Sequence, residues 1–312
     1  MTSISMPLNH APLNLDSLRR SLNDCPIGHT IHYRERTAST MLLAHAERAA
    51  ATDRSGQQAG DLADASGAIF VTEEQSAGRG RMQRVWETPY ASALLVSILL
   101  DATQLSPALR QRPQLLPMLV GVAAAHTLAA LPIKDTGEEL LGRCVTLKWP
   151  NDLLLAIDPL ASPLTYGKVA GILLESSFHH NRLDYVVIGI GLNVNQTRRQ
   201  FPPAQVGAPP PVSLRSSLGR CVDRTSLLVN LCRNLAALLD SAPSSIYNQW
   251  RALLHTLGQP VTVRTMDSRM ADVDSIFEGM AIDVTPEGDL VVENSHRERR
   301  FFSAGAVTLR PN

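Results

Sequence analysis

The sequence lacks the features that mark membrane proteins, disulfide-rich secreted proteins and zinc fingers. No apolar run approaches the roughly 18 residues that a membrane-spanning helix needs, and the nearest, Ser92–Leu100, has the length of a core strand. The four cysteines, at positions 25, 144, 221 and 232, form neither a C-x-x-C pair nor a zinc-ligand spacing. Scattered in this way, they indicate reduced core thiols, so we expect a cytoplasmic protein that does not act in a membrane.

An excess of charge of either sign is also missing, because 29 Lys and Arg residues balance 29 Asp and Glu residues. A whole-chain electrostatic footprint for nucleic acid is therefore absent. The first 25 residues contain one Arg19–Arg20 pair and no apolar signal-peptide region, which predicts a helical or disordered extension over residues 1–29. Hydrophobic residues make up 44% of the 312 residues, enough for the cores of about two domains.

Residues 30–257 have the pattern of a mixed α and β domain. Helices are expected at 41–51, 115–131, 225–239 and 244–257, the last ended by Gly258 at C′. Strands are expected at 32–36, 67–72, 91–100, 144–149, 153–157, 169–176 and 185–193. Connections after residue 144 are short, which favours antiparallel neighbours. Polar loops at 52–66 and 132–142, a linker at 107–113 and an irregular proline-rich stretch at 202–211 join these elements.

The pattern of hydrophobic and polar residues changes after Gly258. Short alternating segments at 260–265, 275–283, 289–293 and 300–309 are separated by turns. Residues 258–312 are therefore predicted to form a small all-β module of the size of an SH3 domain.

A glycine- and arginine-rich loop, EQSAGRGRMQRVW, follows a predicted buried strand. Gly78 and Gly80 allow a sharp turn with inward N–H groups, while Arg79, Arg81 and Arg84 carry guanidinium forks that match phosphate or carboxylate oxygens. The loop is neither a P-loop nor a dinucleotide fingerprint. It predicts an anion site for a nucleotide phosphate, with a solvated basic loop as the alternative.

A second motif, K-W-P-N-D, ends a predicted strand with Lys148 and presents Asn151 and Asp152 in a turn. Lysine supplies a point charge, and the asparagine amide can recognise a base edge or a ribose. Asn and Asp after proline are also ordinary turn formers, which is the alternative interpretation.

Two further strands carry unusual residues. Lys168 opens the apolar strand K-V-A-G-I-L-L-E, where an ammonium is costly unless it meets a buried anion. Gly171 in that strand, and the two glycines of V-I-G-I-G-L-N-V-N, allow a ligand or another backbone to approach closely. The second of these strands leads to Asn193 and Asn195.

The order of these four motifs resembles that of the biotin protein ligases, or holocarboxylase synthetases, from about Thr30 to the C-terminus. The resemblance implies an α+β fold with a mixed, largely antiparallel central sheet flanked by helices, like that of class II aminoacyl-tRNA synthetases, and a small C-terminal SH3-like domain. It also implies an ATP-dependent ligase that activates biotin as biotinyl-5′-AMP. The biotin would then pass to a lysine of a carboxylase's biotin-carrier domain, with Mg²⁺ entering on ATP and no dedicated protein ligands for the metal.

The resemblance also implies the site residues. Lys168 and Arg81 would be catalytic, at the junction of carboxylate and phosphate. The biotin site would comprise Ser39, Thr40, Met41, Gln75, Gly78, Arg79, Gly80, Arg81, Lys168 and Gly171. The ATP and adenylate site would comprise Arg81, Arg84, Trp86, Lys148, Asn151, Asp152, Lys168 and Asn193. The apolar part of biotin would lie against strand residues such as Ile172 and Leu173.

The chain departs from the commonest bacterial pattern at Met41, where asparagine often stands, and at Gln83, where glycine often stands. Because about thirty residues precede the catalytic region, we expect no helix-turn-helix domain and no DNA binding. A homodimer is left open. Two alternatives remain: a lipoate–protein ligase or octanoyltransferase, whose R-R-x-x-G-G-G motif is missing from this sequence, and an inactive module that senses biotinyl-adenylate.

Overall fold

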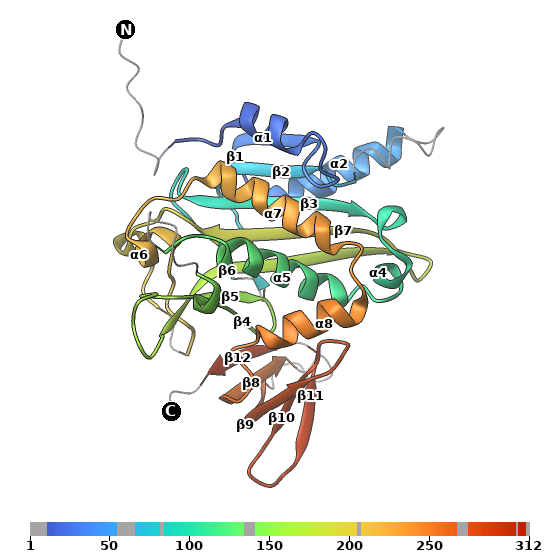
Figure 1. Cartoon of the computed structure of the whole chain (residues 1–312). Coiled ribbons are helices and arrows are strands. Elements are labelled where there is room, and N and C mark those ends of the chain that lie inside the picture. Colours follow the sequence, from blue (N-terminus) through green and yellow to red (C-terminus); the bar gives the residue numbers. More distant parts are fainter. Residues whose placement is uncertain are drawn as a thin grey trace.

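The structure, a computed structural model, describes residues 11–54, 66–81, 84–133, 141–204, 207–266, 274–303 and 305–309 (Figure 1). Its centre is a seven-stranded sheet in the order β1-β2-β3-β7-β6-β5-β4. β1 and β2 pair in parallel and the remaining neighbours pair antiparallel, as predicted. The strands are β1 (Ile31–Thr37), β2 (Ile69–Gln75), β3 (Ala93–Asp101), β4 (Val145–Lys148), β5 (Asp152–Ala156), β6 (Tyr166–His179) and β7 (Arg182–Asn193).

Helices cover both faces of this sheet. On one face lie α5 (Leu115–Ala129) and α7 (Arg224–Leu238), and on the other lies α2 (Thr40–Arg54) (Figure 1). Shorter helices are α1 (Leu15–Leu22), α4 (Pro107–Gln111), α6 (Leu214–Leu218) and α8 (Pro243–Ala252). Single 3₁₀ turns occur at η2 (Ala102–Gln104), η3 (Gly142–Cys144) and η4 (Arg198–Gln200).

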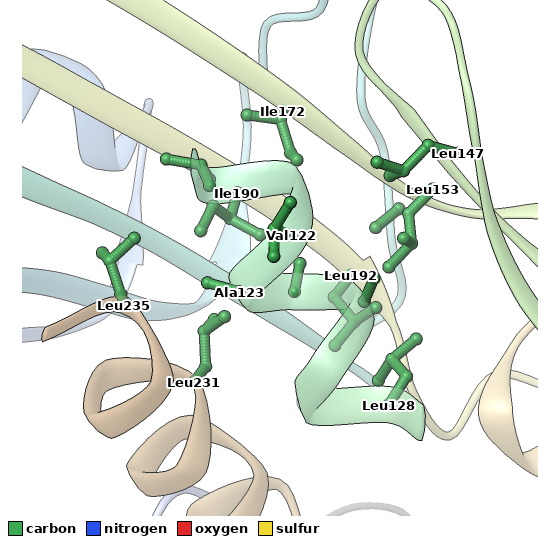
Figure 2. Packing of buried hydrophobic residues seen from close by; sticks show 14 of the residues in the cluster. Val122, Ala123, Leu128, Leu147, Leu153, Ile172, Ile190, Leu192, Leu231 and Leu235 are labelled. Atoms are coloured by element: carbon green, nitrogen blue, oxygen red, sulfur yellow. The ribbon is translucent and has the colours of Figure 1, made fainter. Parts of the chain in front are cut away.

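The main core lies between the sheet and α5. This helix is apolar around its whole circumference, which is typical of a helix buried on all sides. Figure 2 shows Ile190 and Leu192 of β7 directed towards Val122 and Ala123 of α5, with Leu231 of α7 packed beside them. A smaller cluster on the opposite face joins α2 to the sheet. Successive side chains of each strand point to opposite faces of the sheet. One face is therefore packed against α5 and α7, and the other is only partly covered by α2.

The N-terminal segment is part of this core from residue 11 onward. α1 packs on α7, and its Leu18 and Leu22 are fully buried. α1 agrees with the helical one of the two alternatives, helical or disordered, predicted for residues 1–29. Its place in the core was not expected.

The C-terminal module is a five-stranded antiparallel sheet in the order β11-β10-β9-β8-β12, as the alternating segments predicted. Its strands are β8 (Pro260–Met266), β9 (Asp274–Val284), β10 (Leu290–Glu293), β11 (Arg299–Phe302) and β12 (Ala306–Leu309). Trp149 of the K-W-P-N-D motif joins the two sheets. Its indole nitrogen donates to the Gly288 carbonyl at 2.8 Å, and its backbone N–H donates to the Thr256 hydroxyl at 2.9 Å.

Several predicted boundaries are wrong for local reasons. The segment 107–113 contains α4, because the Ser106 hydroxyl accepts from the Leu109 N–H and Pro107 suits the first turn. α8 ends at Ala252, so Gly258 does not terminate it; its N–H pairs with Ala281 before β8 begins. The expected strand 300–309 is two strands, β11 and β12. α2 extends to residue 54 of the expected loop 52–66, and residues 55–65 lie outside the described part.

A buried ion pair fastens the N-terminal segment to the sheet. Arg224 and Glu73 are 2.7 Å apart, and both side chains are almost completely buried. The guanidinium also donates to the carbonyls of Ala93 and Ala11, and the Glu73 carboxylate accepts from the Leu13 N–H. Segments distant in sequence are therefore joined through one charged pair.

Glu73→Ala is expected to lower the free energy of unfolding by about 3–5 kcal/mol, because the Arg224 guanidinium stays buried without its carboxylate. Urea denaturation followed by circular dichroism measures this change. The exposed Glu298→Ala is the control and should change stability by no more than about 0.5 kcal/mol. A loss below about 1 kcal/mol for Glu73→Ala would show that the pair is dispensable.

Candidate active site

A cavity of about 900 Å³ lies on the α2 side of the central sheet. Fifteen of the sixteen site residues that the family resemblance implied line it. They are Ser39, Thr40, Met41, Gln75, Arg79, Gly80, Arg81, Arg84, Trp86, Lys148, Asn151, Asp152, Lys168, Gly171 and Asn193. Gly78 is the exception. A side chain there would collide with the Trp86 carbonyl, so this glycine permits two backbones to approach.

Positive charge is concentrated around one carboxylate in this cavity. The Lys168 ammonium lies 2.7 Å from Asp152, and Lys148, on the neighbouring strand β4, is buried. Burial lowers the pKa of Lys148 most; Asp152 opposes this effect, and the nearby cations Lys168, Arg84 and Arg81 add to it. Burial also lowers the pKa of Arg81, but a guanidinium remains charged in proteins. The site therefore favours an anionic ligand.

A β-bulge in β6 places Lys168 in the cavity. The pairing of β5 with β6 shifts between Leu153, opposite Ala170, and Leu154, opposite Lys168, so Val169 is the extra residue. Strict alternation would put Lys168 and Gly171 on opposite faces, since they are three positions apart. With the bulge both face the cavity, and a Cβ on Gly171 would lie 3.5 Å from the Lys168 Nζ atom.

The arginine-rich loop forms a short hairpin, here called the arginine hairpin (residues 78–81 and 84–86). Gly80 donates to the Arg84 carbonyl at 2.7 Å, and Trp86 donates to the Gly78 carbonyl at 2.9 Å. Arg79 and Val85 pair between these bonds. Gln83, the expected departure in this loop, lies outside the described residues.

The Trp86 ring rests on the glycines of the sheet. A Cβ on Gly191 would lie 2.6 Å from the ring and one on Gly171 would lie 3.2 Å from it. The Lys168 Nζ is 5.4 Å from the ring centroid. Among the described residues, the buried Trp86 indole N–H has no hydrogen-bond partner.

A set of hydroxyl and amide groups forms the end of the cavity next to α2. Thr40 donates from its N–H to the Gln75 side-chain oxygen at 2.8 Å, and its hydroxyl lies 2.8 Å from that of Ser97. Ser39 beside it is 98% buried. Met41 packs against Gly189, where a Cβ would lie 2.7 Å from the sulfur. This end suits a neutral polar ring with an apolar flank.

The two predicted asparagines mainly hold the walls together. The Asn151 amide donates to the Ile172 carbonyl at 2.8 Å, and its side-chain oxygen accepts from Arg81 at 3.4 Å. Asn193 donates to the Val212 carbonyl and accepts from Gln196. Both line the cavity while their main partners are protein groups.

Ile172 and Leu173, which were predicted to lie against the apolar part of the ligand, both line the cavity. The Ile172 side chain belongs to the core beside α5, as Figure 2 shows, because its neighbours in the strand alternate between the two faces. Leu173 lies on the cavity face with Gly171 and belongs to the cluster beneath α2.

One wall of the cavity was not predicted from the sequence. Residues 200–204, 207–209 and 211 of the proline-rich stretch line it, together with Gly305, Val307 and Thr308 of the C-terminal module. This stretch runs beside the start of β6, where the Lys168 N–H donates to the Pro210 carbonyl at 2.8 Å. No motif marks these residues, because they are brought there by long-range packing.

No group of three or more His, Cys, Asp or Glu side chains in the described part gathers as a metal site would require. Within the same part, no helix has the length and apolar character needed to traverse a bilayer.

Comparisons with known proteins identify relatives of the chain. Residues 58–193 match the Biotin/lipoate A/B protein ligase family. A biotin–[acetyl-CoA-carboxylase] ligase from Paracoccus denitrificans is 36% identical over 241 residues, which are 74% of this chain and 88% of that protein. The bifunctional ligase/repressor BirA of Bacillus subtilis is 28% identical over 242 residues. These are 76% of this chain and 65% of the Bacillus protein, so the chain spans slightly less than two thirds of that relative.

A similar solved structure is that of the biotin protein ligase from Aquifex aeolicus in complex with biotin and ATP. The TM-score is 0.60 at 20% identity, covering 91% of this chain and 99% of that one. The likeness shows that the chain has the fold of a biotin protein ligase. The identity to the Paracoccus enzyme over most of its length shows that the chain belongs to the biotin/lipoate A/B protein ligase family.

Lys148→Met is expected to raise the free energy of unfolding at neutral pH by about 1 kcal/mol, because it removes a buried charge. Since the folded state lowers the pKa of Lys148, the unfolded chain holds more protons between that lowered value and the ordinary 10.5. Wild-type stability should therefore rise with pH across this window, and the variant should lack that contribution. Urea denaturation at a series of pH values measures it.

The exposed Arg299→Met on β11 is the control for this series, because it removes a cation from a surface ion pair. Its stability should follow the wild-type pH dependence. A Lys148→Met protein that is less stable than wild type at every pH would show that the ammonium is fully compensated by Asp152.

Proposed function

We propose that the protein is an ATP-dependent biotin–protein ligase. The observation that carries the proposal is the convergence of Arg81, Lys148 and Lys168, from three distant segments, on one cavity that ends in buried hydroxyl and amide groups. Two anions must meet in the reaction, a carboxylate and a triphosphate. Fixed cations in a cavity that limits water reduce their repulsion and stabilise the charge that develops on phosphate.

The end of the cavity next to α2 would hold biotin. Buried Ser39 and Thr40, with Gln75, offer donors and acceptors to the ureido ring, while Leu173 and Met41 supply apolar contact. The carboxylate of biotin would then extend towards Arg81 and Lys168. This orientation places its oxygen beside the cationic cluster, where ATP would bind.

In the first step a biotin carboxylate oxygen would attack the α-phosphorus of ATP. The bond from that phosphorus to the bridging oxygen breaks, which yields biotinyl-5′-AMP and pyrophosphate. Lys168 and Arg81 would contact the carboxylate and the phosphate oxygens as negative charge builds. Mg²⁺ would enter as part of the ATP substrate and neutralise its phosphates. Trp86 and Lys148 would border the nucleotide.

In the second step a lysine amine of a biotin-carrier domain would attack the acyl carbon of the adenylate. An amide bond forms, the bond between acyl carbon and phosphate oxygen breaks, AMP leaves and the amine loses a proton. The hairpin and the proline-rich wall would shield the adenylate from water before this transfer.

The relatives favour biotin over lipoate as the acid. The Paracoccus relative is named a biotin–[acetyl-CoA-carboxylase] ligase, and the Aquifex structure contains biotin and ATP. Both site lysines and the arginines of the hairpin are retained here, which supports an active enzyme over an inactive sensor.

Incubation with ATP, Mg²⁺, labelled biotin and a biotin-carrier domain tests the proposal directly. We expect label in the carrier and none in a carrier whose acceptor lysine is replaced by arginine. Isothermal titration with biotin and with lipoate separates the two acids. Tight binding of lipoate alone would overturn the biotin assignment, and pyrophosphate release without transfer to any carrier would indicate a sensor.

Lys168→Ala is expected to slow adenylate formation by about 10²–10³-fold, because it removes a cation from the reacting oxygens. Pyrophosphate release from ATP and biotin measures this rate. Arg300→Ala, which removes an exposed cation of β11, is the control and should keep the wild-type rate. A wild-type rate in Lys168→Ala would exclude the proposed role of Lys168.

A further inference from the structure

Glu175 of β6 belongs to a motif but has no role in the reaction described above. Its carboxylate receives contacts from two sides. Arg79 of the arginine hairpin lies 3.2 Å from one carboxylate oxygen and 3.5 Å from the other. His45 of α2 places its Nε2 atom 2.7 Å from the second oxygen. One carboxylate thus joins a helix, the central sheet and the hairpin.

A chain of contacts behind His45 orients this carboxylate. The Nδ1 atom of His45 lies 3.1 Å from the Tyr185 hydroxyl, and the Arg48 guanidinium lies 5.3 Å from the centre of the Tyr185 ring. Arg48 in turn is 2.8 Å from Asp184 and 3.2 Å from Asp101. Because His45 is bonded through both ring nitrogens, its orientation, and with it that of the carboxylate, is defined before Arg79 binds.

The hairpin requires such an anchor because of its glycines. Gly78 and Gly80 flank Arg79, and glycine leaves the backbone many conformations of similar energy. The first arm of the hairpin has side-chain contacts at two points: Arg79 with Glu175, and Arg81 with Asn151. The first contact defines where the arm lies over the sheet, and the second lies at the cationic cluster.

We propose that Glu175 is a positioning residue, which holds the first arm of the arginine hairpin through Arg79 and so places Arg81 for the acid substrate. The expected effect on biotin binding rests on the proposed function. The anchoring of the hairpin itself rests only on contacts within the protein. An exposed ion pair alone contributes little. Here the carboxylate is already oriented by His45, so less side-chain entropy is lost when Arg79 binds.

A double-mutant cycle with Glu175→Gln, Arg79→Gln and the double variant tests the positioning role. The first readout is the rate of trypsin cleavage after Arg81 in the protein without ligand, and the second is the dissociation constant of biotin. Each single variant should raise the cleavage rate and the dissociation constant of biotin about three- to tenfold. The double variant should show no further increase, because both substitutions remove the same contact.

Salt and a matched variant separate this role from a general structural one. Raising NaCl from about 0.05 M to about 0.5 M screens the ion pair and should bring the wild-type cleavage rate towards that of Glu175→Gln. The cleavage rate of Glu175→Gln should change little with salt, because this variant lacks the pair. The control Glu298→Gln removes the carboxylate of a more exposed pair on the C-terminal module and should match the wild type. In steady-state assays Glu175→Gln should raise KM for biotin and also lower kcat, because Arg81 would contact the phosphate oxygens as negative charge builds.

Two outcomes would overturn the proposal: wild-type cleavage and biotin affinity in Glu175→Gln, or effects of the two single variants that multiply in the double variant. Thermal unfolding shows whether each protein is folded. If Glu175→Gln is not, the exposed Arg79→Gln and the distal Tyr185→Phe test the same contact, the latter with a smaller effect expected. Faster cleavage without any biotin binding would support the anchor while refuting the ligase function, so the two failures are distinguishable.

Discussion

The cavity depends on one electrostatic constraint: several cations gather around the Asp152 carboxylate in a partly buried space. Lys168 pairs with Asp152. Burial lowers the pKa of both Lys148 and Arg81, and the charge of Arg81 lowers the pKa of Lys148 further. Like charges repel more strongly where water is scarce. The protein therefore carries an unfavourable concentration of positive charge that an anionic ligand relieves. Under the proposed function, the same feature would attract the anionic substrates and stabilise a charged transition state, at a cost in stability of the free protein.

Glycines in the central strands make room for this arrangement. Gly171 of β6 lies opposite Gly191 of β7, and Leu173 lies opposite Gly189, so the cavity face of the sheet is nearly bare at its centre. The Trp86 ring and the Met41 side chain rest on this surface. Larger residues at these positions would push the arginine hairpin and α2 away from the sheet, and the cations of the hairpin would no longer reach those of the strands.

Much of the fold and of the site followed from local patterns. Alternation and apolar runs located the central strands and the core helix α5. The motifs supported a family resemblance, and that resemblance implied most of the residues that line the cavity. The errors have local causes as well, since the Ser106–Pro107 cap begins a helix where a linker was expected. The wall made by the proline-rich stretch could not be predicted, because its position depends on pairing with the start of β6 rather than on its own residues.

The sequence by itself determined which groups carry charge, where backbone freedom lies and which strands are apolar, because these are properties of single residues and their nearest neighbours. Tertiary structure alone decided which of them meet. The bulge at Val169 brings Lys168 to the same face as Gly171, against the two-residue period of a strand. The contact of Arg79 with Glu175 joins residues 96 positions apart. Such pairings arise when the whole sheet packs against its helices, since no short stretch of chain contains both partners.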